Sequence, residues 1–258
     1  MSILSDRDIR RALDRGDIRI GYAGAREWED APEEPWRIQP SSLEVTLGVG
    51  HGSLLGYTRP MTGSPVGIVD PEDPPAMVPR VWERTARKDE RGWRPFYILR
   101  PGEFVLGSTA EQLFISPALC AAIEGKSSLG RLGLMIHATA RFIDPGWVGR
   151  LTLEFFNASP RPIRLWGGMR IGQVRFERLS SPSERPYGDE SLGSHYQGSV
   201  DTVQASSVAY VAPEPVLLTT DTDTQIRHAR CETPSLVAAG GDLVCRSCGT
   251  SLALPPPA

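Results

Sequence analysis

The residues best suited to chemistry begin at a short turn of small and basic side chains. Gly125 is followed by Lys126, Ser127 and Ser128, and Arg131 comes soon after. Backbone amides in such a turn can point at one anion, while lysine and arginine donate charge-assisted hydrogen bonds to its oxygens. The glycine frame of a Walker A loop, G-x-x-x-x-G-K-[ST], is absent. The turn therefore predicts a phosphate-binding site of another kind.

A candidate acid or base follows on a predicted strand. Leu151, Leu153 and Phe155 alternate with Thr152 and Glu154, which is the period of a half-buried strand. Glu154 then lies on the face opposite the leucines, and a carboxylate on a rigid strand near a phosphate site is a candidate general base. The same residues also fit an ordinary turn and an exposed strand carboxylate, because positioned acids are a minority of carboxylates.

Three ordered motifs resemble one family. Residues 125–134 read GKSSLGRLGL, residues 143–149 read IDPGWVG and residues 153–155 read LEF, with further similarity at 101–109, 168–173 and 183–188. This order resembles the dCTP deaminase family, which is related to the trimeric dUTPases. The resemblance covers residues 1 to about 200, with a gap near 50 to 90. It implies an all-β fold, a distorted jelly roll or dUTPase-like β-barrel, assembled as a homotrimer with active sites between subunits.

The resemblance also implies roles for particular residues. Glu154 is expected to take a proton from a water held near Arg131, Ser127 and the backbone of Ala140, so that the water attacks C4 of a cytosine ring. Asp144 is expected to contact the deoxyribose 3′-hydroxyl, and Mg²⁺ is expected to accompany the phosphates. The full expected nucleotide-binding set is Lys126, Ser127, Ser128, Leu129, Gly130, Arg131, Asp144, Thr152, Leu153, Glu154, Gln173, Tyr187, His195 and Ser199.

Some positions depart from the family pattern. Glu44 and Thr46 stand where the family has aspartate and arginine, and His195 and Ser199 stand where it has a lysine and a glutamine near the phosphates. These departures leave open how many phosphates the substrate carries, which sugar is preferred and whether the cytosine base is modified. Arg141, just before the 143–149 motif, leaves the product open between dUTP and dUMP. Two other functions stay open: a dUTPase-like phosphohydrolase, and a non-catalytic nucleotide sensor.

Composition sets the remaining bounds. The chain has 258 residues and a formal net charge of −3, so a nucleotide would be held by a local basic pocket rather than a global field. No apolar leader or membrane-spanning run is present, and we expect a cytoplasmic protein without a membrane partner.

A short capped helix is predicted from Ser5, Ile9, Leu13 and Gly16. Regular Pro and Gly punctuation after Phe96 favours an all-β domain.

The expected domain boundaries follow from proline, glycine and serine content. We expect one domain over 1–200, with a proline-rich loop insertion at 50–95 that has room for one short strand, and a lid-like segment at 181–200. We further expect a linker at 201–225, a small metal-binding module at 226–252 and a disordered end at 253–258.

The C-terminal module carries four metal-ligand types in two close pairs. His228 and Cys231 form one pair, and Cys245 and Cys248 the other, which predicts structural Zn²⁺ in a Cys3His zinc ribbon or knuckle. Catalytic zinc of the cytidine deaminases needs H-x-E and P-C-x-x-C, and Val244 precedes the cysteine pair here. The module could contact nucleic acid or a protein, or staple the tail.

Two further residues have a simpler interpretation. His137 lies in an apolar stretch, so we expect a satisfied core histidine or one at a trimer axis. Cys120 is flanked by alanine and leucine and is expected to be a small buried hydrophobe.

Overall fold

The chain folds as two compact units, Met1–Ser207 and Val208–Ala258, which we describe separately. The computed structural model describes residues 2–23, 28–30, 37–49, 53–57, 69, 74–84, 95–203, 205–206, 236–239, 242–245 and 251–253. No helix within these ranges is long and apolar enough to cross a membrane.

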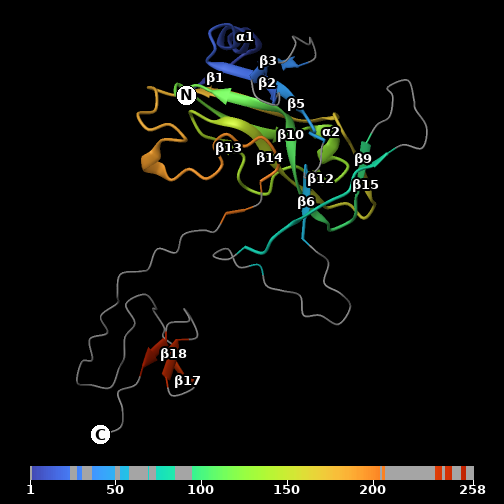
Figure 1. Cartoon of the computed structure of the whole chain (residues 1–258), viewed down its shortest axis with the longest axis vertical. Helices are drawn as coiled ribbons and strands as arrows, with labels where there is room; N and C mark the ends of the chain where they lie inside the picture. The colour runs from blue at the N-terminus through green and yellow to red at the C-terminus, as the bar shows by residue number, and fades with distance from the viewer. Residues whose placement is uncertain are drawn as a thin grey trace. The chain divides into compact units, whose positions relative to one another are not determined.

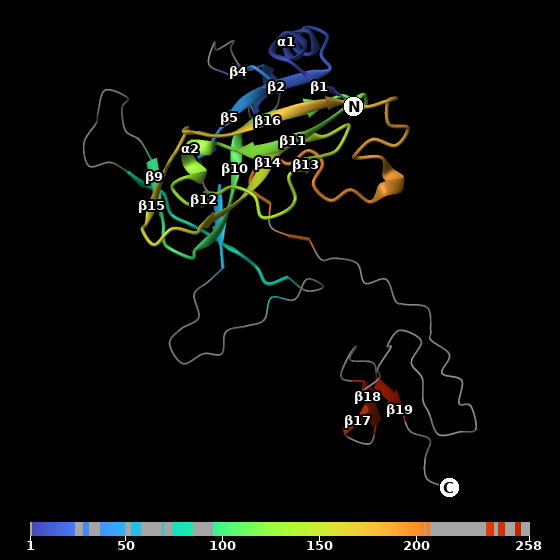
Figure 2. The ribbon, with the colours of Figure 1, turned by 180° about the vertical axis from the view of Figure 1, so that it is seen from behind.

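Two antiparallel sheets build the first unit (Figures 1 and 2). One sheet consists of β1 (Ser2–Ile3), β4 (Ile38–Gln39), β5 (Ser42–Thr46), β11 (Leu119–Gly125), β13 (Phe142–Ile143) and β16 (Arg170–Arg178). Its order is β13-β11-β16-β5-β4, and β1 pairs with β16. The other sheet consists of β2 (Ile18–Ala23), β3 (Trp28–Asp30), β6 (Leu54–Gly56), β7 (Val78–Pro79), β10 (Phe104–Ile115), β12 (Leu134–Met135) and β14 (Val148–Asn157). Its order is β12-β14-β10-β2-β3, with β6 between β10 and β7.

Among the described residues of this unit, a small third sheet and three short helices remain. The sheet has the order β15-β9-β8, and its members are β8 (Glu83–Arg84), β9 (Pro95–Leu99) and β15 (Ile163–Trp166). The helices are α1 (Asp6–Asp14), α2 (Ser127–Gly130) and the 3-10 turn η1 (Glu190–Leu192). Strands thus dominate the described residues, which confirms the all-β prediction.

The inner faces of the two large sheets share one core. Along β14, Leu151, Leu153 and Phe155 are 6%, 0% and 0% exposed, while Thr152 and Glu154 between them are half-buried on the other face. Val45 on β5 and Val174 on β16 belong to the same hydrophobic cluster. The alternation read from the sequence therefore separates a core face from a face that is free to line a cavity.

The first helix is capped as expected. Ser5 Oγ accepts a hydrogen bond from Asp8 N at 3.4 Å, and Gly16, with φ of +75°, follows the helix. Ile9 is fully buried and Leu13 packs against the core. Helix α1 lies at one end of the two sheets in both views (Figures 1 and 2).

The proline-rich stretch contains more strand than expected. Within its described part lie β6, β7 and β8, where the sequence predicted room for only one short strand. Leu55 of β6 pairs with Leu106 of β10, and Pro79 of β7 pairs with Leu55. These strands form because β6 pairs with the distant strand β10, which the local sequence does not reveal. Since β6 and β7 are short, the prolines nearby remove few hydrogen bonds between strands.

A buried ion pair joins the two large sheets. Arg37 Nη1 donates to Glu111 Oε1 at 2.9 Å, and the two residues are 3% and 0% exposed. Glu111 also accepts hydrogen bonds from Thr46 N at 2.9 Å and from Thr46 Oγ1 at 2.8 Å. The pair thereby fixes β10 against β5.

The described residues of the second unit form one small antiparallel sheet. Its strands are β17 (Leu236–Ala239), β18 (Asp242–Cys245) and β19 (Ser251–Ala253), in that order. Cys245 is the last residue of β18, whereas His228, Cys231 and Cys248 lie outside the described residues. The expected zinc site stays a prediction.

Candidate active site

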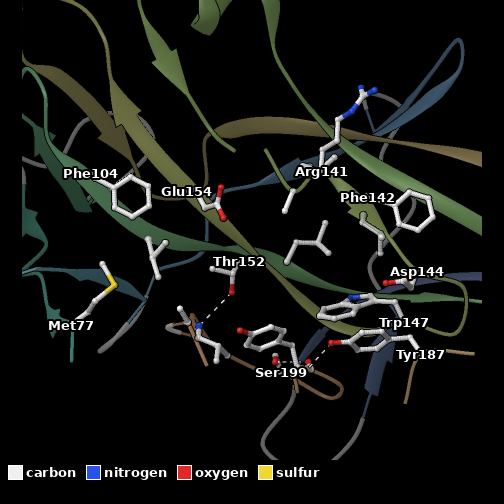
Figure 3. A pocket seen from close by; sticks show the side chains of 18 of the residues that line it. Met77, Phe104, Arg141, Phe142, Asp144, Trp147, Thr152, Glu154, Tyr187 and Ser199 are labelled. Carbon is white, nitrogen blue, oxygen red and sulfur yellow. Dashed lines mark hydrogen bonds between the residues drawn. The ribbon is translucent and has the colours of Figure 1, made fainter. Parts of the chain in front are cut away.

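A cavity of about 520 Å³ lies against the outward face of β14 (Figure 3). Thr152 and Glu154 form its floor, and the segment from Ala140 to Trp147 forms one wall. Residues from other parts of the chain complete it: Tyr57, Met77, Phe104, Leu106, Ile123, Leu151, Tyr187, Tyr196, Ser199, Val203 and Ala205. A cavity of this size is in the range of small-molecule sites.

Glu154 is oriented by backbone groups of the neighbouring segment. Its Oε2 accepts a hydrogen bond from Ala138 N at 2.6 Å, and its own amide donates to Ile136 O at 2.9 Å. Within the described residues, Oε1 has no hydrogen-bond partner. The carboxylate is therefore fixed by one oxygen and can accept a proton or a water on the other.

Aromatic side chains and a carboxylate form the other end of the cavity. The rings of Trp147 and Tyr187 are 5.3 Å apart between centroids and tilted by 48°. Asp144 lies beside them (Figure 3), and partial burial raises the pKa of its carboxyl above the ordinary value. Burial also raises the pKa of the Tyr187 hydroxyl, which accepts a hydrogen bond from Tyr196 N at 3.2 Å. This end offers an apolar platform and a carboxylate acceptor, which suits a sugar and its hydroxyl.

One side of the cavity is lined by Tyr196, Ser199, Val203 and Ala205. Arg150 N donates to Ser199 O at 2.7 Å, Val203 N donates to Thr152 Oγ1 at 3.3 Å, and Thr202 Oγ1 donates to Ser53 O at 2.7 Å. The sequence predicted a lid-like segment at 181–200 and a linker from residue 201, whereas the first compact unit extends to Ser207. The one sequence signal for this side of the cavity is Gly149, whose φ of +142° allows Ser199 to approach.

The expected phosphate cradle lies outside this cavity in a single chain. Helix α2 begins after Lys126, and the side chains of Ser127, Ser128 and Arg131 are exposed, with no hydrogen bond within the described residues. Lys126 instead forms an ion pair with Glu44, which is 3% exposed and also accepts from Arg170 Nη1 at 3.2 Å. Lys126 is thus held by Glu44 within its own chain, and none of residues 126–131 lines the Glu154 cavity.

Four other expected residues also lie outside the Glu154 cavity. Leu153 is fully buried in the core, and Leu129 of α2 packs against the core from outside. Gln173 on β16 accepts from Ser42 Oγ at 3.1 Å. His195 lines a second cavity of about 380 Å³ next to Asp144.

One chain therefore brings together only part of the expected site. Lining the Glu154 cavity are Ala140, Asp144, Thr152, Glu154, Tyr187 and Ser199. Absent from its lining are Lys126, Ser127, Ser128, Leu129, Gly130, Arg131, Leu153, Gln173 and His195. Tyr57, Met77 and Val203 line it although sequence reasoning did not select them.

Cys120 and His137 lie outside the lining of the Glu154 cavity. Cys120 is 5% exposed, which confirms a buried cysteine, and burial raises the pKa of its thiol. His137 is half-buried, and its Nδ1 is buried without a hydrogen bond within the described residues. The expectation of a satisfied core histidine is therefore not met within one chain.

Comparison with known proteins places the chain in a class. Residues 3–179 match the family model described as dCTP deaminase-like, and the chain belongs to this family. Its relatives include a "dCTP deaminase, dUMP-forming" of Bifidobacterium longum (strain DJO10A), 43% identical over 196 residues, or 76% of this chain and 89% of that protein. A protein of the same description from Bifidobacterium animalis subsp. lactis (strain AD011) is 44% identical over 199 residues, with the same coverage.

A solved structure is similar over a smaller part. The 2′-deoxycytidine 5′-triphosphate deaminase of Agrobacterium tumefaciens matches with 22% identity and a TM-score of 0.45. The match covers 69% of this chain and 48% of that chain, so this chain spans about half the length of that protein.

Proposed function

We propose that this chain deaminates dCTP hydrolytically, with Glu154 as general base and general acid in turn. The observation that carries the proposal is the placement of Glu154. In a chain of the dCTP deaminase-like family, this carboxylate lies on a strand that lines a cavity; one oxygen is bound by Ala138 N, and the other has no hydrogen bond within the described residues. A positioned carboxylate of this kind accelerates proton transfer by about 10²–10⁴-fold.

The reaction balances with water alone. Glu154 takes one proton from a water as the water oxygen bonds to C4 of the cytosine ring, and it delivers that proton to N3. The second water proton goes to the exocyclic amine as the bond between C4 and nitrogen breaks, and ammonia leaves. The ring is then uracil, and the carboxylate returns to its starting state.

We further propose that the phosphate cradle serves the Glu154 cavity of a neighbouring chain in a homotrimer. Ser127, Ser128 and Arg131 are exposed, and their side chains form no hydrogen bond or ion pair in the described part of their own chain, as expected for groups that bind an anion between subunits. The phosphates would bring Mg²⁺, for which phosphate oxygens are suitable ligands.

The shared site can be tested by mixing two inactive variants. Glu154→Gln and Arg131→Ala chains should each be inactive alone. After joint refolding in equal amounts, about a quarter of the sites combine an intact Glu154 from one chain with an intact Arg131 from the next, so about a quarter of wild-type turnover returns. If both residues act within one chain's site, mixing restores no activity.

The product is proposed to be dUMP. The names of the Bifidobacterium relatives support this step, in which a second water releases pyrophosphate from the bound uracil nucleotide. We also propose that His228, Cys231, Cys245 and Cys248 of the C-terminal module would hold a structural Zn²⁺ that takes no part in either step.

Product analysis tests the function directly. The chain is incubated with Mg²⁺ and, separately, dCTP, dCMP, CTP and dUTP, and the products are separated by chromatography. We expect dCTP to yield dUMP, pyrophosphate and one ammonia per nucleotide. No consumption of any of the four nucleotides by a folded protein would refute the proposal.

A further inference from the structure

An apolar wall extends the Glu154 cavity beyond the catalytic carboxylate. Glu154 of β14 pairs with Leu106 of β10, and two residues further along β10 Phe104 pairs with Phe156. Two residues along a strand cover about 7 Å. Phe104 is therefore the next position on the same side of β10, past Glu154 and away from Thr152.

Two more residues reach the same level from neighbouring strands. Leu106 also pairs with Leu55 of β6, and Gly56 of β6 pairs with Val78 of β7. Tyr57 directly follows β6 and Met77 directly precedes β7. The antiparallel register thus brings Tyr57 and Met77 to the level of Phe104, and all three line the cavity.

The cavity consequently has two chemically different ends. Figure 3 shows Met77 and Phe104 on one side of Glu154 and Thr152, and Asp144, Trp147 and Tyr187 on the other. Phe104, Met77 and Tyr57 are half-buried, and the neighbouring Leu106 and Val203 add further apolar surface. Water in such a place has few hydrogen-bond partners, and a methionine adapts readily to the shape of a small ligand group.

We propose that this site accepts cytosine deoxynucleotides that carry a small apolar substituent at ring carbon C5, such as 5-methylcytosine. The inference rests on the proposed function, which puts C4 and N3 at Glu154 and the sugar at Asp144. In a pyrimidine nucleoside the sugar is joined at N1, across the ring from C4, so the nucleoside's long axis runs along β14 from Asp144 to Glu154. C5 is adjacent to C4, and its substituent projects past Glu154 towards the wall of Tyr57, Met77 and Phe104.

The chemistry needs no additional reactant. The water oxygen bonds to C4, the exocyclic nitrogen leaves as ammonia, and the substituent at C5 is untouched. A 5-methylcytosine deoxynucleotide is thereby converted to a 5-methyluracil deoxynucleotide, which is a thymidine nucleotide.

The test is a competition between two substrates in one vessel. Wild type is given equal dCTP and 5-methyl-dCTP with Mg²⁺, and the ratio of their kcat/KM values is read from the products by chromatography. Burial of one methyl group against the wall should favour 5-methyl-dCTP by about fourfold, which corresponds to ~0.8 kcal/mol. Met77→Trp, which fills the space, should lower the ratio at least tenfold, whereas Met77→Leu should preserve it.

A second tryptophan variant distinguishes the loss of space at the wall from general damage to the protein. Val81 is 81% exposed and does not line the cavity, so Val81→Trp should keep the wild-type ratio. If wild type converts dCTP but converts 5-methyl-dCTP at less than a tenth of that rate, the inference is wrong while the proposed function stands. Equal ratios in Met77→Trp and Val81→Trp would also overturn it. If neither nucleotide is converted, the proposed function fails together with the inference.

Discussion

The buried ion pair between Arg37 and Glu111 gives the most quantitative prediction of the fold. Replacement of Arg37 by methionine removes the guanidinium that donates to Glu111 at 2.9 Å, to Glu44 O at 3.3 Å and to Tyr22 Oη at 3.2 Å. Glu111 is 0% exposed, and within the described residues its carboxylate then keeps only the hydrogen bonds from Thr46. An uncompensated charge is then left between the two sheets, so we expect Arg37→Met to lower the free energy of unfolding by about 3–5 kcal/mol.

Removal of both charges should cost less than removal of one. In Arg37→Met/Glu111→Leu no buried carboxylate is left alone, although Thr46 N loses its acceptor at a cost of about 1–3 kcal/mol. Urea unfolding at one fixed chain concentration measures all variants, because association would otherwise shift the midpoint. Arg10→Met, which removes the exposed partner of Asp6, is the control and should leave the midpoint unchanged. A double variant as unstable as Arg37→Met, or more so, would refute this reasoning.

Three further predictions concern the cavity and the tail. Gly149→Ala puts a Cβ 2.9 Å from Ser199 O at a φ of +142°, and should cost about 1–3 kcal/mol in urea unfolding and slow dCTP turnover. Gly102→Ala, at a φ of +70° with nothing within 4 Å, should leave turnover intact, and equal slowing in both variants would contradict the clash. Partial burial raises the pKa of Asp144 above 3.8, so its protonated form stabilises the fold fully below pH 3.8 and this contribution is lost as pH rises through the folded-state pKa. As the pH rises through this pKa, the free energy of unfolding should therefore fall less in Asp144→Asn than in wild type. A larger fall in Asp144→Asn would contradict the pKa shift. Metal analysis should find about one zinc per chain, lost in Cys248→Ser, with dCTP turnover intact; turnover that stops on chelation and returns with zinc would show a catalytic metal instead.

Local patterns predicted the parts of the fold that depend on neighbouring residues. The alternation from Leu151 to Phe155 placed Glu154 on the face away from the core, because side chains on a strand alternate regardless of its partners. The Ser5 cap could be recognised because its hydrogen bond spans only three residues, to Asp8. Both predictions are confirmed.

Long-range contacts account for what the sequence did not reveal. Lys126 was expected at phosphate, but it pairs with Glu44, which is distant in sequence and adjacent only through the pairing of β5 with β16 and of β16 with β11. Met77 carries no chemical motif, and only the register of β6 and β7 against β10 brings it to the cavity. Such positions follow from sheet topology, which a single sequence specifies only weakly.

Glu154→Gln is the most direct test of the central claim. The substitution keeps the shape of the side chain and an acceptor for Ala138 N, but it removes the ability to take a proton. Glu184→Gln, at an exposed position outside the cavity, is the matched control. Turnover of dCTP is measured in both variants after urea unfolding has shown wild-type stability. We predict a loss of about 10²–10⁴-fold in Glu154→Gln and wild-type turnover in Glu184→Gln. Turnover in Glu154→Gln within about tenfold of the control would contradict a general-base role for Glu154.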